Sequence, residues 1–330
     1  MSNIKAVAER AGVSVTSVSR MLNNRGYISQ ELRDKVNRAM EELNYHPNEV
    51  ARSLSRRRTH IIGVLVPLIN NPFFAEVVSE LSMALTRHGY KMMIYSAFSA
   101  DAHVSEYISM LKASQVDGMI LALRDKAVEA ELNDDLPVVS FERLRVGNLP
   151  TILCDNEAGG RMAAQELLAC GCRRPMMISN FYSHEIPAYG RMKGFSDVMR
   201  EHGMEPVVVE EKDMEQESDQ TYPLLARRAL AAYPDTDGIF CSSDLLAAYV
   251  QRVLLEMGRR IPEDVQLIGF NSNPFALRLS PALTSIRQPV PEMCEMAVQC
   301  LVKQIHGSHV QADMIFPVTL DRRESTKAPI

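Results

Sequence analysis

Residues 4–22 read IKAVAERAGVSVTSVSRML, and this stretch predicts two short helices separated by a tight turn. Gly12 permits the turn, and the Ser14 side chain can cap the helix that follows it. Apolar side chains repeat at helical spacing on both sides of the turn, at Ile4, Val7, Ala8 and Ala11 and then at Val15, Val18 and Leu22. The stretch therefore predicts two amphipathic helices, each with one face turned towards a common core.

A third helix is expected to complete this core, with Ser29 as its cap and Pro47 closing the unit. Asn3 can cap the first helix in the same way. The inward side chains of the third helix are Leu32, Val36, Ala39, Met40 and Leu43. Three short helices with a glycine turn between the first two form the helix-turn-helix arrangement.

The second helix has a polar surface that suits DNA, with side chains from Ser14, Thr16, Ser17, Ser19, Arg20 and Asn23. Arg and Asn can read base edges in the major groove, and hydroxyls can bind phosphates or bases. A generic three-helix bundle with a polar exposed face fits the same periodicity. The spacing alone therefore does not decide between the two.

Charge is distributed unevenly along the chain. The net charge is −5, which by itself would argue against nucleic acid. Residues 1–60 nevertheless contain 11 Lys and Arg against 6 Asp and Glu, a local charge of +5, which leaves −10 for residues 61–330. A basic segment on an acidic body indicates one module that meets a polyanion and another that does not.

From Ile61 onward, short apolar runs alternate with amphipathic stretches. The predicted strands are 61–66, 92–95, 118–123, 138–141, 176–179, 238–241 and 265–270. The predicted helices are 75–88, 102–113, 157–170, 190–202, 244–257 and 290–306. This alternation favours parallel sheets covered on both faces. Two such groups would form two lobes, with a ligand at the carboxyl ends of the strands.

Composition indicates neither a membrane protein nor a secreted one. No run of 18 apolar residues occurs, and the N-terminus lacks a secretory signal, so we expect a cytoplasmic, nucleoid-associated protein. The six cysteines lack metal-ligand spacing, and we expect them to be reduced and buried. Dinucleotide, Walker, nucleophile-elbow and HExxH motifs are missing from the sequence. We therefore expect no enzyme, no catalytic residue, no cofactor and no metal.

Several motifs resemble those of the lactose-repressor/galactose-repressor family of bacterial transcription regulators. The segment from Ile4 to Arg20 is similar to the opening signature of that family. Tyr45-His46-Pro47-Asn48 and Ala51-Arg52-Ser53-Leu54 resemble its hinge, and Ile61-Ile62-Gly63-Val64 resembles the start of its effector domain. The likeness continues through Asp244, 268–270, 281–286 and 320–325, so it covers effectively the whole chain. Ala6 departs from the family, whose members usually have Asp there.

The resemblance implies an all-α helix-turn-helix domain over 1–47 and a hinge helix or linker over 48–59. Residues 60–330 would form an effector-binding and dimerisation domain, an α/β two-lobed, periplasmic-binding-protein-like fold with parallel sheets. The expected N-lobe comprises about 60–157 and 288–317, and the expected C-lobe about 158–287 and 318–330.

The resemblance also implies a set of DNA-binding residues. Val15 and Thr16 would begin the recognition helix and influence operator choice, while Arg20 would read a base. Leu54 would wedge into the minor groove from a hinge helix that forms on the operator, because an apolar wedge between base steps kinks the duplex. The full set is Ser14, Val15, Thr16, Ser19, Arg20, Asn23, Tyr27, Asn48, Ala51 and Leu54.

Effector-binding positions follow from the same resemblance, namely Asn71, Phe73, Phe74, Glu142, Arg191, Ser243, Asn271 and Gln288. An aromatic face suits the C–H surface of a sugar ring or a flat base, although a core role fits Phe73 equally well. Arg191 would grip vicinal hydroxyls or a carboxylate. Sugar-binding relatives commonly have Asp at the positions of Glu142 and Asn271. A sugar acid or sugar phosphate therefore stays open beside a neutral sugar.

The predicted function is sequence-specific repression of a carbohydrate-utilisation operon, controlled allosterically by a small sugar-like effector. A homodimer on pseudo-palindromic double-stranded operator DNA is expected, because two recognition helices need half-sites related by a two-fold axis. No heptad-bearing tail follows Glu324, which favours a dimer over a tetramer. A periplasmic sugar-binding protein would suit residues 61–330 but not the DNA module. Whether the effector releases the protein from DNA or acts as a corepressor stays open.

Overall fold

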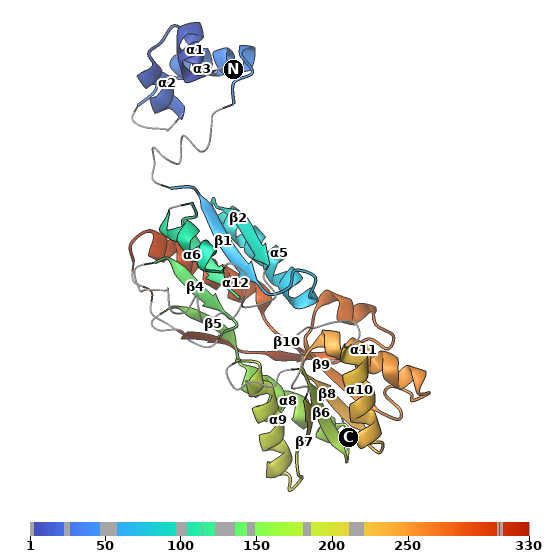
Figure 1. Cartoon of the computed structure of the whole chain (residues 1–330). Helices are drawn as coiled ribbons and strands as arrows, with labels where there is room; N and C mark the ends of the chain where they lie inside the picture. Colours follow the sequence, from blue (N-terminus) through green and yellow to red (C-terminus); the bar gives the residue numbers. More distant parts are fainter. Residues whose placement is uncertain are drawn as a thin grey trace. The chain divides into compact units, whose positions relative to one another are not determined.

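Three helices make up the N-terminal unit, α1 (Ile4–Ala11), α2 (Val15–Leu22) and α3 (Gln30–Glu42) (Figure 1). Their core contains Val7, Val18 and Val36, one from each helix, and all three side chains are completely buried. Arg10 of α1 forms an ion pair with Glu42 at the end of α3. The three predicted helices are therefore present, and one apolar cluster holds them together.

The predicted caps and turn of this unit are confirmed. The Asn3 and Ser29 side chains accept hydrogen bonds from the first turns of α1 and α3, at 2.9 and 3.3 Å. Ser14 Oγ accepts from the Ser17 amide at 3.0 Å at the start of α2. Gly12 ends α1 with φ +68°, in the left-handed region that glycine adopts without steric cost.

The computed structural model describes residues 3–22, 27–46, 58–96, 104–113, 115–122, 136–143, 149–180, 186–210, 221–308, 310 and 313–329. The chain divides into two compact units, Met1–His60 and Ile61–Ile330. The second unit contains two six-stranded sheets, and we name the part around each sheet a lobe. None of the helices in the described ranges is both long enough and apolar enough to cross a membrane.

The N-lobe sheet has the strand order β11-β5-β4-β3-β1-β2, and its described pairs are all parallel. Its elements are β1 (Ile61–Val66), α5 (Pro72–Arg87), β2 (Lys91–Ser96), α6 (Val104–Lys112), β3 (Gly118–Leu121), β4 (Val138–Phe141), β5 (Thr151–Cys154), α12 (Val290–Ile305) and β11 (Asp313–Phe316). Alternate side chains of β1 enter different clusters. Val64 joins the cluster with α5 and α12, and Leu65 joins the cluster with α6.

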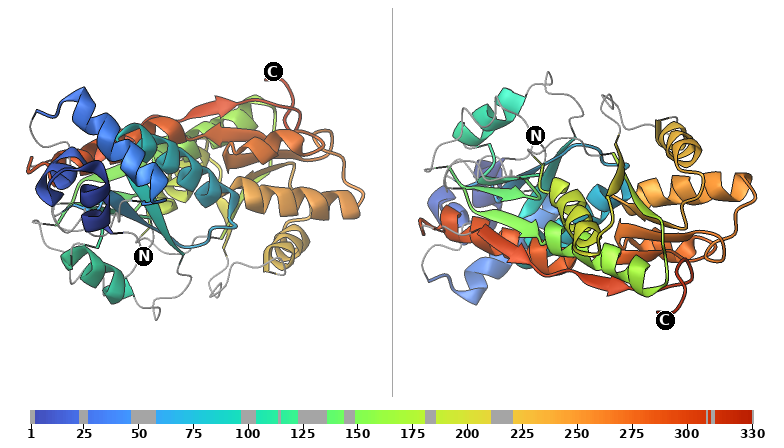
Figure 2. Two further views of the ribbon diagram at one scale, coloured as in Figure 1. Left: turned by 90° about the horizontal axis from the view of Figure 1, so that it is seen from above. Right: turned by 90° about the horizontal axis from the view of Figure 1, so that it is seen from below.

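The C-lobe sheet has the order β12-β10-β9-β8-β6-β7. Its elements are α8 (Asn156–Ala169), β6 (Pro175–Ser179), α9 (Tyr189–Glu201), β7 (Val207–Glu210), α10 (Thr221–Ala232), β8 (Gly238–Cys241), α11 (Asp244–Glu256), β9 (Gln266–Asn271), η1 (Pro274–Arg278), β10 (Thr284–Arg287) and β12 (Thr319–Asp321). Helices α8 and α9 cover one face, and α10 and α11 cover the other (Figure 1, Figure 2). Among the strand pairs that the structure describes in this lobe, β10 with β12 is the antiparallel one.

The polypeptide passes between the lobes at three places. It leaves the N-lobe after β5 and enters the C-lobe through α8, which contacts β8, β10 and β12. It returns between β10 and α12, which packs on α5. It crosses again between β11 and β12. Short connections at the lobe boundary allow two α/β lobes to move relative to each other.

The fold class predicted from the sequence is confirmed. The alternating pattern after Ile61 corresponds to helices and strands, and β1, β4 and β8 have the predicted bounds. Five short strands, β5, β7, β10, β11 and β12, and the helix α10 were not predicted from the sequence.

Candidate functional site

The exposed face of α2 carries the predicted DNA-reading side chains. Val18 and Met21 point into the core, whereas Val15, Thr16 and Arg20 are exposed. Ser19 is half-buried on the same helix. An apolar side chain, a hydroxyl and a guanidinium thus share one accessible surface, and this is the chemistry that contacts base edges and phosphates.

Two of the other predicted DNA contacts, Ser14 and Tyr27, are described by the structure. Tyr27 is 93% exposed, so its ring is available to a partner. Ser14 is exposed, and its hydroxyl already caps α2. The remaining predicted contacts, Asn23, Asn48, Ala51 and Leu54, lie outside the described residues.

Arg191 stands at the centre of a buried polar network in the second unit. Only 4% of its surface is exposed, although it lies in the first turn of α9. Its Nε donates to Asn156 Oδ1 at 2.8 Å and its Nη1 donates to the Ser242 carbonyl at 2.5 Å. The guanidinium carbon lies 3.6 Å from the centre of the Phe270 ring, a cation–π distance. Burial lowers the pKa of Arg191, and arginine nevertheless stays protonated in proteins.

Glu142 reaches the same network from the N-lobe, directly after β4. Its Oε1 accepts from the Cys154 amide at 2.5 Å, and its Oε2 accepts from Asn156 Nδ2 at 3.4 Å. Asn156 therefore contacts both Glu142 and Arg191. Burial raises the pKa of the Glu142 carboxyl, and the positive charge of Arg191 opposes that shift. A carboxylate and a guanidinium are thus held near each other at the junction of the lobes.

Asn271 and Gln288 form a second polar pair, at the carboxyl ends of β9 and β10. Gln288 Nε2 donates to Asn271 Oδ1 at 2.7 Å. Both side chains are buried, and Gln288 Oε1 has no partner within the described part of the chain. A buried amide oxygen without a donor costs about 1–3 kcal/mol. A ligand hydroxyl could relieve that cost by donating to Gln288.

The aromatic turn, residues 71–74, begins α5. Asn71 Oδ1 accepts from the Phe73 amide at 3.0 Å and so caps the helix. The rings of Phe73 and Phe74 meet edge to face with centres 5.2 Å apart. Both are half-buried and pack against the large core cluster. The two readings of Phe73, core and ligand contact, are therefore compatible.

The Ser243 side chain caps a helix. Its Oγ accepts from the Leu246 amide at 3.2 Å and caps α11. The neighbouring Ser242 is completely buried, and its hydroxyl donates to Asn180 Oδ1 at 2.7 Å. At this end of β8 the backbone carbonyl of Ser242 is thus the group that holds Arg191.

Residues 3–48 match the family profile described as bacterial regulatory proteins, lacI family, and residues 164–326 match the periplasmic binding protein-like domain. A ribose operon repressor of Halalkalibacterium halodurans is 34% identical over 334 residues, covering 99% of this chain and 98% of that protein. The chain belongs to the lacI family of bacterial regulatory proteins. A sucrose operon repressor of Streptococcus mutans is 32% identical, with 98% and 99% of the two chains covered. Both relatives of this lacI-family chain are named as operon repressors.

Solved structures show the same architecture. A lac repressor dimer bound to operator and the anti-inducer ONPF has a TM-score of 0.86 at 24% identity, covering 99% of both chains. At this identity the likeness shows a shared fold. A transcriptional regulator CelR–cellobiose complex has a TM-score of 0.72 at 28% identity, covering 98% of this chain and 100% of that one. A lacI-family regulator from Enterococcus faecium with bound ribose has a TM-score of 0.72 at 26% identity, covering 82% and 99%.

The lacI-family chain brings part of the predicted effector set together. Glu142 and Arg191 share the partner Asn156, and Asn271 bonds Gln288. Three members of the Arg191 network, Asn156, Ser242 and Phe270, were not predicted. Phe270 and Ser242 immediately precede the predicted Asn271 and Ser243, so strand ends were the available signal for them. Asn156 carried no signal of its own in the sequence.

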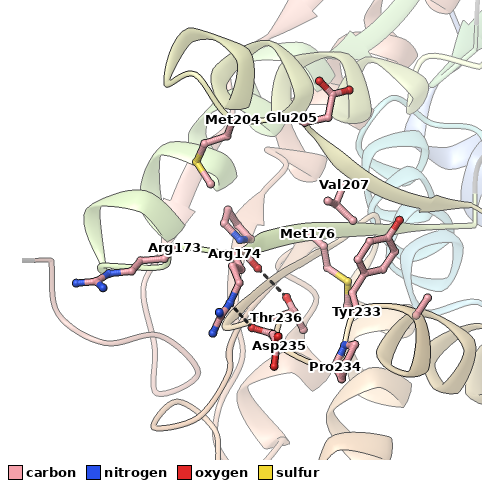
Figure 3. A pocket seen from close by; sticks show the side chains of 12 residues that line it. Arg173, Arg174, Met176, Met204, Glu205, Val207, Tyr233, Pro234, Asp235 and Thr236 are labelled. Atoms are coloured by element: carbon pink, nitrogen blue, oxygen red, sulfur yellow. Dashed lines mark hydrogen bonds between the residues drawn. The ribbon is translucent and has the colours of Figure 1, made fainter.

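A cavity of about 520 Å³ lies elsewhere in this lacI-family chain, at the amino ends of β6, β7 and β8 (Figure 3). Met176, Met204 and Tyr233 contribute apolar surface to it. Arg174 is fixed at its edge, because Nε donates to the Asp235 carbonyl at 2.7 Å. The predicted effector residues do not line this cavity, since they follow the opposite, carboxyl ends of the strands.

Proposed function

We propose that this chain represses a sugar-utilisation operon and that a neutral sugar, bound at the junction of the lobes, controls its hold on operator DNA. The buried network around Arg191 supports the proposal most strongly, because it joins side chains of both lobes in a chain that also contains a helix-turn-helix unit. Relatives named for ribose and sucrose operons match along nearly the whole chain, which supports a sugar as the effector class.

The charges of the network favour a neutral sugar over a sugar acid or sugar phosphate. Asn271 carries no charge, which alone would make the site more tolerant of anions. Glu142 nevertheless supplies a buried carboxylate close to Arg191, so the positive charge of the guanidinium already has a counterpart. An anionic ligand would have to compete with that carboxylate. Sugar hydroxyls can instead donate to Glu142 and Gln288 and accept from Arg191.

The individual contacts are part of the proposal. We assign DNA contact to the exposed face of α2 and to Tyr27, Asn48, Ala51 and Leu54. Effector contact is assigned to Arg191, Glu142, Asn271, Gln288 and the aromatic turn, with Ser243 contributing at the rim. The proposed domains are the helix-turn-helix domain over 1–47, the hinge over 48–59 and the effector domain over 60–330. Within the effector domain the proposed lobe boundaries lie near 157, 287 and 317.

The operator complex is proposed to be a homodimer on a pseudo-palindrome, acting on the nucleoid in the cytoplasm. Two copies of α2 would then occupy half-sites related by the dimer axis. A sugar that prefers one lobe arrangement would shift the population of the DNA-binding form, by no more than its difference in affinity for the two forms.

Thermal-shift screening tests the effector class. The probes are D-ribose, sucrose and cellobiose as neutral sugars, with gluconate and ribose 5-phosphate as anions. Hundredfold excess over Kd should stabilise the chain by about 2.7 kcal/mol and raise its Tm by roughly 4–5 °C. A rise with a neutral sugar is expected. A rise with the anions alone would contradict the inferred class, and no rise with a broad sugar panel would contradict a sugar effector.

A further inference from the structure

A hydrogen bond joins a side chain of the N-lobe to a side chain of the C-lobe, and both residues are close in sequence to proposed effector contacts. Asn273 follows β9 in the C-lobe, and its Nδ2 donates to Glu76 Oε2 at 2.5 Å. Glu76 lies in the second turn of α5. Helix α5 belongs to the N-lobe, where it packs on α12 (Figure 1). The bond connects residues 197 positions apart in the chain, so it depends on how the two lobes are arranged. We name this pair the interlobe clasp.

The C-lobe half of the clasp is held rigidly. Asn273 is 2% exposed, and its backbone N–H donates to Asp244 Oδ2 at 2.7 Å. Asp244 Oδ1 in turn accepts from Ser285 Oγ at 2.5 Å. Gly269 makes room for this carboxylate, because a Cβ there would lie 2.3 Å from Asp244 Oδ1. The backbone of Asn273 is thus bonded to Asp244 at the start of α11, and Asp244 is bonded to Ser285 of β10.

The backbone leading to the clasp has an uncommon conformation that fixes Asn271 as well. Asn271 and Ser272 have φ +111° and +54°, both in the region that side chains other than glycine rarely adopt. The Ser272 amide donates to Ser285 Oγ at 3.0 Å, which stabilises this turn. Because only Ser272 separates Asn271 from Asn273, this fixed turn links the position of the clasp residue to that of the proposed effector contact.

The N-lobe half of the clasp is similarly close to effector contacts. Glu76 is half-buried and lies one turn along α5 from the aromatic turn, residues 71–74. Burial raises the pKa of the Glu76 carboxyl, and the hydrogen bond from Asn273 and the positive charge of Arg287 oppose that shift. Arg287 itself bonds Asp321 Oδ2 at 2.5 Å. An ionised carboxylate accepts a stronger hydrogen bond from the Asn273 side chain than a neutral oxygen would.

We propose that Glu76 and Asn273 are positioning residues of the effector site. Their bond holds the aromatic turn of the N-lobe and Asn271 of the C-lobe at a fixed separation, so that one ligand can contact both. The bond itself keeps the two lobes in this arrangement. Its role in effector response rests on the proposed function, whereas its effect on lobe separation does not.

Spin-label distance measurement on the ligand-free full chain tests the clasp without any effector. Labels go on cysteines introduced by Ile315→Cys on β11 and Leu224→Cys on α10, positions that are 61% and 67% exposed on different lobes. The six native cysteines are all buried and are therefore poorly reactive. An excess of unlabelled chain prevents signals between labelled copies. Thermal unfolding confirms that each variant is folded.

Glu76→Ala and Asn273→Ala should each broaden the distance distribution to at least about twice the wild-type width, because a second lobe arrangement becomes populated. The double variant should match the single variants, since both remove the same bond. Glu76→Gln should restore the narrow distribution, because its amide oxygen still accepts from Asn273. Unchanged distributions in the alanine variants would overturn the proposal, as would a Glu76→Gln chain as broad as Glu76→Ala.

Discussion

At the scale of single residues, Arg191 offers the sharpest test of the effector site. Lysine would keep the charge but could not bond both Asn156 and the Ser242 carbonyl while lying flat over Phe270. We predict that Arg191→Lys weakens sugar binding at least about tenfold, or about 1.4 kcal/mol. Isothermal titration calorimetry measures the loss. Lys193→Ala, on an exposed part of the same helix, should bind sugar like the wild type.

Asp244 makes a second prediction at this scale, on pH. Burial raises the pKa of its carboxyl from an ordinary 3.8 to about 7. Between these values the folded chain holds a proton that the unfolded chain has released. The free energy of unfolding should therefore fall as pH rises from about 4 to about 7, by up to about 1.4 kcal/mol per pH unit from this group.

Urea unfolding from pH 4.5 to 7.5 checks this slope. Asp244→Asn should lose the contribution, so that the difference in unfolding free energy between the two chains changes with pH. A difference that stays constant over the range would show that Asp244 is ionised throughout.

Residues differ in how far the sequence could predict them. Arg191 was predictable because its motif resembles that of a known family. Its partners Asn156 and Ser242 were not, because they lie 35 and 51 positions away and meet it only after α8, α9 and β8 have packed. The clasp residues Glu76 and Asn273 were even less predictable from the sequence, because neither belongs to a recognisable motif.

At the scale of secondary-structure elements, the crossing of α8 and α9 positions Arg191 against Asn156. A Cβ on Gly160 would lie 2.0 Å from the Arg191 carbonyl oxygen, and one on Gly194 would lie 2.1 Å from that of Glu157. Both obstacles are backbone atoms, so relief requires the helices to separate. We predict that Gly194→Ala destabilises the chain by about 1–3 kcal/mol or more, as overpacked cores do.

The same substitution should reach the effector site. Separation of α8 from α9 would lengthen the Arg191–Asn156 bond, so sugar affinity should fall together with Tm. Lys193→Ala is again the matched control, because that side chain is 57% exposed and its surface ion pair with Glu157 contributes little. A Gly194→Ala chain with wild-type Tm and sugar affinity would contradict close packing at this crossing.

Elements with a clear hydrophobic pattern were the predictable ones. The strands β1 and β4 are buried runs, and their bounds followed from the sequence. β11 and β12 are short edge strands with alternating or partial exposure, so their composition resembles that of loops. Their pairing is set by chain segments far away in sequence, β5 and β10, which periodicity cannot reveal.

At the scale of the whole molecule, the chain should work as two separable modules. The division after His60 predicts that a chain lacking residues 1–58 still folds and binds sugar. It should lose specific operator binding, because α2 and the proposed hinge contacts are removed. Calorimetry and DNase footprinting measure the two activities on the same preparation. Retained operator specificity in the truncated chain would contradict the division of labour.

Measuring operator binding with and without sugar shows whether one site in the lobes controls one DNA-reading surface. Fluorescence anisotropy with DNA from upstream of the chain's own gene gives the affinity for wild type and Arg191→Lys. We predict that a neutral sugar changes the wild-type Kd at least about tenfold, within the usual 1–3 kcal/mol of allosteric coupling, and that Arg191→Lys loses most of this change. An operator Kd that no sugar alters, or an equal response in both chains, would show that the Arg191 site does not control DNA binding.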